Sequence, residues 1–81
     1  MTKHETQIHN TRHLIKHKKR DELLGVYKKI EQLSHDSLQC IIADEYNAIA
    51  TLKRLNAETR KAIQLNLEII ELESKLKELL S

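Results

Sequence analysis

Apolar residues recur at helical spacing through the middle of the chain, between residues 23 and 42. Because a helix turns once in about 3.6 residues, most of them fall on one stripe of a helix. The residues of this stripe are Leu23, Tyr27, Ile30, Leu33, Leu38, Ile41 and Ile42. The opposite side carries the polar residues Lys28, Lys29, Glu31, Gln32, His35, Asp36 and Gln39. The pattern predicts an amphipathic helix with one side that needs cover.

This first helix is expected to begin at Asp21 and Glu22, since acidic residues in a first turn offset the positive end of the backbone dipole. Gly25 lowers intrinsic helicity by about 1 kcal/mol relative to Ala, and the sequence leaves open whether it permits a close helix approach. The polar run 34–37 can cap a new helix at Asp36 or lie within a longer one. Continuity is favoured, because no Gly or Pro interrupts the stripe.

The stripe loses its phase at residues 43–45, and a second apolar pattern follows. Asp44 fits the amino-terminal cap of a second helix. A corner of this length is usual between antiparallel helices. The apolar residues of the second pattern are Tyr46, Ile49, Leu52, Leu55, Ala62 and Ile63.

The most regular periodicity lies near the end of the chain, where large aliphatic residues alternate in steps of four and three. These residues are Leu65, Ile69, Leu72, Leu76 and Leu79. Such spacing is typical of a coiled-coil seam. The sequence leaves open whether a third helix starts at Asn66 or the second helix continues through it. We therefore predict an all-α fold, a small antiparallel helical bundle or hairpin of two to three amphipathic helices.

Charge is unevenly distributed along the chain, whose formal net charge is +2. Basic residues outnumber acidic ones strongly in residues 1–20, while the remainder is mildly acidic. We predict a basic, partly ordered arm over residues 1–20 and a helical domain over residues 21–81. An arm that contacts nucleic acid or an acidic partner would use Arg12, Lys16, Lys18, Lys19 and Arg20. The arm has no aromatic residue to stack on bases, so nucleic acid is the less favoured partner.

Three histidines of the arm, His9, His13 and His17, recur every fourth residue and would align along one side of a helix. Such a row can bind a transition metal. No Cys or carboxylate completes a tetrahedral set with them, so a solvated segment is the favoured interpretation and no metal site is predicted.

Composition narrows the classes of function. A chain of 81 residues has a small core, so helices from a second copy or another protein are expected to complete it. No apolar run approaches the roughly 20 residues of a membrane span, and the first residues lack the apolar core of a secretory signal, so we expect a cytoplasmic protein. Cys40, the single cysteine, is expected to pack rather than react. There is no Gly-rich phosphate loop and no clustered carboxylate pair, so we expect neither enzyme activity nor a cofactor.

Three stretches, residues 26–41, 44–52 and 62–80, together resemble the flagellar export chaperones of the FliT type. The segment VYKKIEQLSHDSLQCI (26–41) is similar to the first helix of that family. The segment DEYNAIATL (44–52) is similar to its corner, with Tyr46 where the family more often has Trp. The segment AIQLNLEIIELESKLKELL (62–80) is similar to its closing part.

The resemblance implies a non-enzymatic binding protein that shields a helical segment of an export client, such as the filament-cap protein. A helical bundle with an exposed apolar stripe can receive a partner's helix in a groove. The implied groove consists of Tyr27, Ile30, Tyr46, Ile49 and Leu52, and the last helix would cover it through Ile69, Leu72, Leu76 and Leu79 when no client is bound. The alternative is a self-associating coiled-coil regulatory or adaptor protein whose basic arm contacts nucleic acid or an acidic partner.

Overall fold

The computed structural model describes residues 2–43 and 45–81, and the side chains of residues 2–39 and 46–81. The described chain consists of α1 (Lys3–His13), a π-helical segment η1 (Leu14–Lys19), α2 (Arg20–Ala43) and α3 (Glu45–Leu80). These ranges contain no β-strand, which confirms the predicted all-α class. Helix α3 continues through Asn66, so residues 45–80 form one long helix rather than two.

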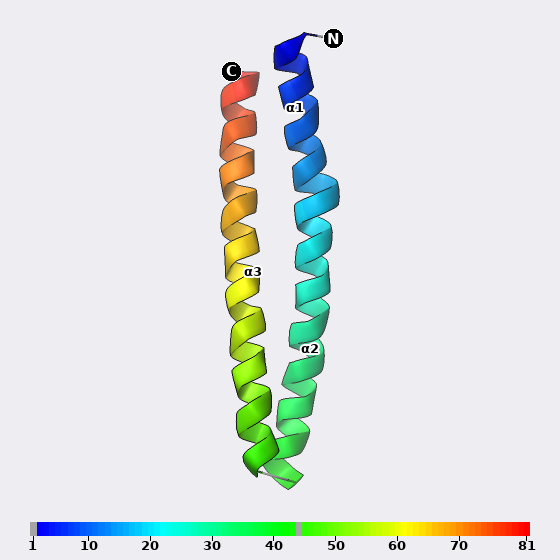
Figure 1. Cartoon of the computed structure of the whole chain (residues 1–81), viewed down its shortest axis with the longest axis vertical. Coiled ribbons are helices and arrows are strands. Elements are labelled where there is room, and N and C mark those ends of the chain that lie inside the picture. The colour runs from blue at the N-terminus through cyan, green and yellow to red at the C-terminus, as the bar shows by residue number, and fades with distance from the viewer. Residues whose placement is uncertain (1, 44) are drawn as a thin grey trace.

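Two long helical stretches lie side by side in a thin rod (Figure 1). Helix α1, η1 and α2 follow one another without a break, α3 lies alongside them, and both chain ends lie at the same end of the rod. The rod measures 60 × 16 × 13 Å. Its radius of gyration is 17.9 Å, against about 12 Å for a compact domain of this length. A rod only two helices wide has little interior.

Helical structure begins earlier than the apolar pattern predicts. Thr2 caps α1, because its Oγ1 accepts a hydrogen bond of 3.1 Å from the backbone N–H of Glu5. The sequence Thr2-x-x-Glu5 is the signature of a capping box, and it would have predicted a helix start at Lys3. Helix α2 has Asp21 and Glu22 in its first turn as predicted, but helical backbone precedes it.

The π-helical segment η1 keeps the inward-facing residues in register. The buried and half-buried residues of this stretch are Ile8, Thr11, Ile15, Lys19, Leu23, Val26, Ile30, Leu33 and Ser37, together with Leu14 and Asp36 beside them. From Leu23 onward the inward positions alternate in steps of three and four, but the interval from Ile8 to Leu23 is one residue longer than two heptads. The N–H of Arg20 donates to the carbonyl of Ile15, five residues back, so the wider π turn takes up the extra residue.

Helix α3 presents an uninterrupted heptad pattern to the other stretch. Its inward positions are Ala48, Thr51, Leu55, Glu58, Ala62, Leu65, Ile69, Leu72, Leu76 and Leu79. The buried core is formed by Ile15, Leu23, Ala62 and Ile69, with Val26, Ile30, Leu65, Leu72 and Leu76 packed against it. This core lies toward the chain ends. We call residues 3–30 and 62–80 the terminal half, and residues 31–39 and 46–61 the loop half.

The first apolar residues of the second pattern do not face the other helical stretch. Tyr46, Ile49 and Leu52 are 87%, 56% and 42% exposed, while Ala48 is 7% exposed. The reason is that α3 is one rigid helix with a single phase. The strong repeat in its last turns fixes which residues face inward near its start.

The structure also bears on the predictions for residues 34–37 and for Gly25. Helix α2 runs unbroken through residues 34–37, which confirms the favoured continuity. No atom lies within 4 Å of the place where a Cβ on Gly25 would stand, so Gly25 does not serve a close helix approach. The predicted cap Asp44 and the side chain of Cys40 lie outside what the structure describes.

Candidate partner-binding face

Polar contacts between the two helical stretches identify the two broad sides of the rod. On one side, Arg20 Nη2 lies 2.9 Å from Glu73 Oε1. About two turns further along, the Nδ2 of Asn66 donates to the Tyr27 hydroxyl at 3.1 Å. On the opposite side, Lys19 Nζ contacts Glu68 and, at 3.9 Å, Glu22. The first two contacts flank a surface of large apolar side chains.

Large apolar residues lie beside these two contacts at helical spacing. Leu24 is on the same side of α2 as Arg20 and Tyr27, four residues after one and three before the other. Ile63 and Ile70 flank Asn66 in the same way on α3. Residues 14 positions away, two heptads on, extend the surface toward the loop. We call it the apolar face: Leu24, Tyr27, Leu38, Ile49, Leu52, Ile63 and Ile70, which are between 42% and 60% exposed.

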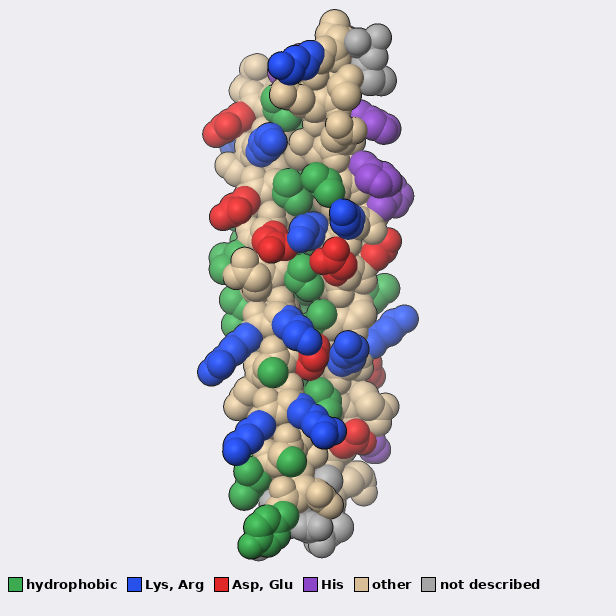
Figure 2. Space-filling model, viewed as in Figure 1, with side chains coloured by type: hydrophobic (Ala, Val, Ile, Leu, Met, Phe, Trp, Pro, Cys, Tyr) green, Lys and Arg blue, Asp and Glu red, His purple; other side chains and the backbone are tan. Residues whose placement is uncertain are grey.

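Charge separates the apolar face from the opposite side of the rod. Along α3, the positions on the apolar side from residue 49 to 70 are Ile49, Leu52, Asn56, Thr59, Ile63, Asn66 and Ile70, none of them charged. The corresponding positions on the other side are Ala50, Arg54, Ala57, Lys61, Gln64, Glu68 and Glu71. Figure 2 shows one side of the rod that is dense in Lys, Arg, Asp and Glu, with smaller groups of hydrophobic side chains along its middle, at its edges and at its lower tip. The polar residues Asn56, Thr59 and Asn66 lie between the apolar ones, but this side of α3 carries no charge, and depletion of charge is typical of an interface core.

The loop half is packed with small and polar residues where the terminal half has large aliphatic ones. Ser37 is 5% exposed, and its Oγ has no hydrogen-bond partner among the described residues. Glu58 Oε1 pairs with Lys61 at 3.0 Å, but its buried Oε2 makes no hydrogen bond to any residue that the structure describes. Leu33 and Leu55 are half-buried in this half, whereas Leu38, Ile49 and Leu52 are exposed.

The nine predicted partner-binding residues divide into two groups in the structure. Tyr27, Ile49 and Leu52 belong to the apolar face, and Tyr46 lies at its loop end. The other five are partly or fully buried between the helices: Ile30, Ile69, Leu72, Leu76 and Leu79. The sequence pattern missed Leu24, Leu38, Ile63 and Ile70 as members of the exposed face. Their spacing of seven or fourteen residues, from Leu24 to Leu38 and from Ile63 to Ile70, is the signal that could have found them.

The implied covering of a groove by the last helix is not present in this structure. Ile69, Leu72 and Leu76 pack toward Ile15 and Leu23 in the terminal half. Tyr46, Ile49 and Leu52 lie at the other end of the same straight helix. Because α3 is continuous, its last turns cannot fold back over its first ones.

Two residues of the predicted basic cluster form ion pairs within the chain. Lys19 pairs with Glu68, and Arg20 pairs with Glu73. The hydrogen bond between Lys19 and Glu68 raises the pKa of the lysine and lowers the pKa of the glutamate. Arg12, Lys16 and Lys18 remain exposed on the first stretch.

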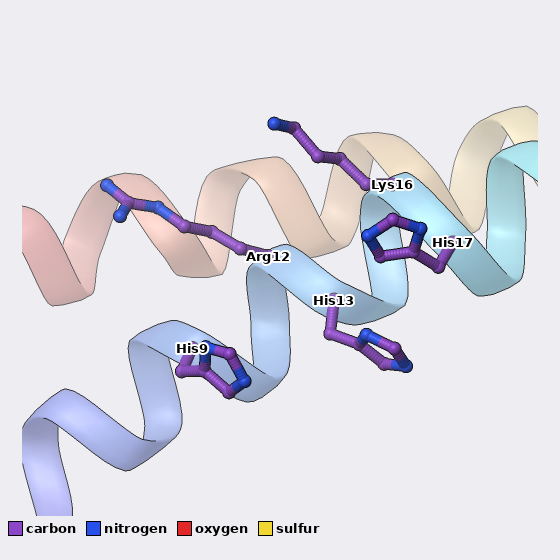
Figure 3. Close-up of a pocket in the computed structure, with 5 residues that line it drawn as sticks. All are labelled: His9, Arg12, His13, Lys16 and His17. Atoms are coloured by element: carbon purple, nitrogen blue, oxygen red, sulfur yellow. The ribbon is translucent and has the colours of Figure 1, made fainter.

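The histidine row lies on the outside of α1 and η1, as the spacing predicts. His9, His13 and His17 line a shallow pocket of about 120 Å³ together with Arg12 and Lys16. Figure 3 shows the rings of His13 and His17 near each other, with their centroids 5.0 Å apart, and the two cationic side chains extending away from them. Among the described residues, no group of three His, Cys, Asp or Glu is placed to hold a metal ion.

The comparisons with known proteins leave the chain to be interpreted from its own residues. No family model, curated protein or solved structure matches it. Within the described ranges, no helix is both long enough and apolar enough to cross a membrane.

Proposed function

We propose that this chain is a non-enzymatic, cytoplasmic binding protein, an antiparallel two-helix hairpin that packs amphipathic helices against its apolar face. The observation that carries the proposal is the exposure of seven large apolar residues on one side of the rod. Along α3 this side is free of charge for about six turns. Amphipathic helices bind such surfaces through residues spaced three, four and seven apart.

The inverted packing of the loop half supports the same function. Ser37 and Glu58 face inward with unpartnered oxygens, whereas Leu38 and Ile49 face outward. Burial of a large apolar side chain stabilises a protein more than burial of Ser or Ala. A partner that covers the exposed Leu and Ile side chains of the loop half would therefore contribute the most stabilisation there. The arrangement costs stability in the isolated chain and favours association.

The FliT-type resemblance makes the partner specific: a helical segment of an export client such as the filament-cap protein. In support, Tyr27, Tyr46, Ile49 and Leu52 are exposed although the last turns of α3 are packed elsewhere. A client helix would reach them without displacing any part of the hairpin. In this chaperone form the last turns of α3 hold the hairpin together and do not compete with the client.

A direct test titrates the chain with a fluorescent amphipathic helical peptide, at protein concentrations where the chain is monomeric. The peptide carries Leu at heptad positions, and a scrambled peptide of the same composition serves as the reference. Leu52→Asp places a charge on the apolar face and should weaken binding about tenfold or more. Ala50→Asp, on the opposite side of the same turn, should leave binding unchanged. Equal binding of both peptides, or equal loss in both variants, would contradict the proposal.

A further inference from the structure

The exposed surface of the chain is larger than its mass predicts. Its accessible area is 6392 Å². A compact monomer of 9.5 kDa exposes about 5,000 Å². The excess of roughly 1,400 Å² is surface that a globular fold of the same mass would bury. A partner that packs against a broad side of the rod would bury this excess surface.

The position of the apolar face shows how much of that surface one contact can cover. From Ile49 to Ile70 the face follows α3 for about 32 Å, at 1.5 Å per residue. Over the 16 Å width of the rod this is about 500 Å² per copy, or about 1,000 Å² for two faces. That area reaches the lower bound of specific interfaces, and the rest of the 60 Å rod adds a polar rim.

The character of the face permits an identical partner. Glu31 is the single charged residue on it between Leu24 and Leu38, and α3 contributes none from Ile49 to Ile70. Two copies of a strongly charged surface would repel each other, but this face carries almost no charge that could cause such repulsion. Two-fold pairing brings the same patch of each copy together, so it leaves no apolar face uncovered.

We infer that the occupant of the apolar face is a second copy of this chain. Two hairpins stack face to face, and their four helices enclose Leu24, Tyr27, Ile63 and Ile70 of each copy in a shared core. This four-helix arrangement buries the third apolar position of each heptad, which a two-helix rod leaves exposed. The inference rests on the proposed function, because it assigns the same helix-binding face to a second copy when no client helix is bound.

The test is the mass of the intact chain in solution, measured by light scattering and sedimentation over a range of concentrations. We expect about 19 kDa, twice the chain mass of 9.5 kDa. Ile63→Asp should weaken the dimer about 100-fold or more, because it buries a charge without a partner. Ile49→Asp probes a second position on the face if the first variant is poorly folded. Gln64→Asp adds the same charge one residue away, on the opposite side, and should leave the dimer intact.

Each outcome decides between the two proposals. A mass of 9.5 kDa at roughly 100 μM and above overturns self-association. If that monomer still binds the amphipathic peptide through Leu52, the partner is a different protein and the proposed function stands. A dimer that survives both Ile49→Asp and Ile63→Asp, with helicity retained, overturns the role of the face. A monomer that binds neither itself nor the peptide overturns both proposals.

Discussion

The two halves of this rod are built from the same heptad pattern but place their apolar residues differently. In the terminal half, Ile15, Leu23 and Ile69 fill the space between the helices, and ion pairs flank them. In the loop half the inward positions include Ser37, Ala48 and Glu58, while Leu38 and Ile49 are exposed. The terminal half therefore has the better-packed interior, whereas the exposed apolar face runs along both halves, from Leu24 and Ile70 to Leu38 and Ile49. Regular helical geometry alone does not make a core.

The largest expected effect separates the halves by their packing. Ile69→Ala removes a buried side chain from the terminal core and should lower the free energy of unfolding by about 2–4 kcal/mol. Leu55→Ala removes a half-buried side chain from the loop half and should cost about 1–2 kcal/mol. Urea unfolding followed by circular dichroism measures both. Equal losses in the two variants would show that the halves contribute equally to stability.

A smaller effect of opposite sign is expected in the loop half. Ser37→Ala removes a buried hydroxyl without a hydrogen-bond partner in the described part of the chain and replaces it with a better helix former, so stability should rise by about 1 kcal/mol. Ser74→Ala, at an exposed position of α3, controls for helix propensity alone and should give the smaller gain. If Ser37→Ala lowers the unfolding midpoint, the hydroxyl has a partner in solution and the loop half is better satisfied than described.

The smallest effect concerns the ion pair beside the terminal core. The pKa of Glu68 is lowered in the folded chain by its hydrogen bond with Lys19, so its contribution is complete above the ordinary carboxyl range and is lost as pH falls. The pKa of Lys19 is raised, so its share is present below the ordinary lysine range and is lost as pH rises above it.

Glu68→Gln should therefore lower stability slightly near neutral pH and flatten the decline toward acid, as followed by thermal unfolding between pH 7 and pH 3. Glu71→Gln is a suitable control, because Glu71 makes no ion pair in the described structure. A pH profile unchanged by Glu68→Gln would mean that the pair is too hydrated to couple to folding.

Local pattern predicted part of this architecture. The all-α class, the break near residues 43–45 and the inward seam of residues 65–79 follow from periodicity and agree with the structure. The inward phase near Tyr46 could not be read locally, because a distant part of the same helix imposes it. The large apolar residues there have helical spacing, but they lie on the exposed side of α3. The pattern therefore located the exposed face and did not identify the inward positions such as Ala48.

The face itself was only partly accessible from sequence. Tyr27, Ile49 and Leu52 were predicted as partner-binding residues and lie on it, but Ile30 and Ile69 are inside the rod. The division depends on which helix side meets the other stretch. Contacts such as Asn66 with Tyr27 join residues far apart in the chain, and no local pattern reports them.

The π-helical segment has a consequence for the tolerance of this chain to insertions and deletions. Because η1 holds one residue more than the heptad repeat requires, the loss of a single residue between Leu14 and Lys19 can turn it into ordinary α-helix with Thr11 and Leu23 still facing inward. The same loss in the middle of α3 would rotate every later side chain by about 100°. At η1 the length of the chain can therefore change by one residue without a change in which side chains face inward. Natural or engineered length variants are best tolerated there.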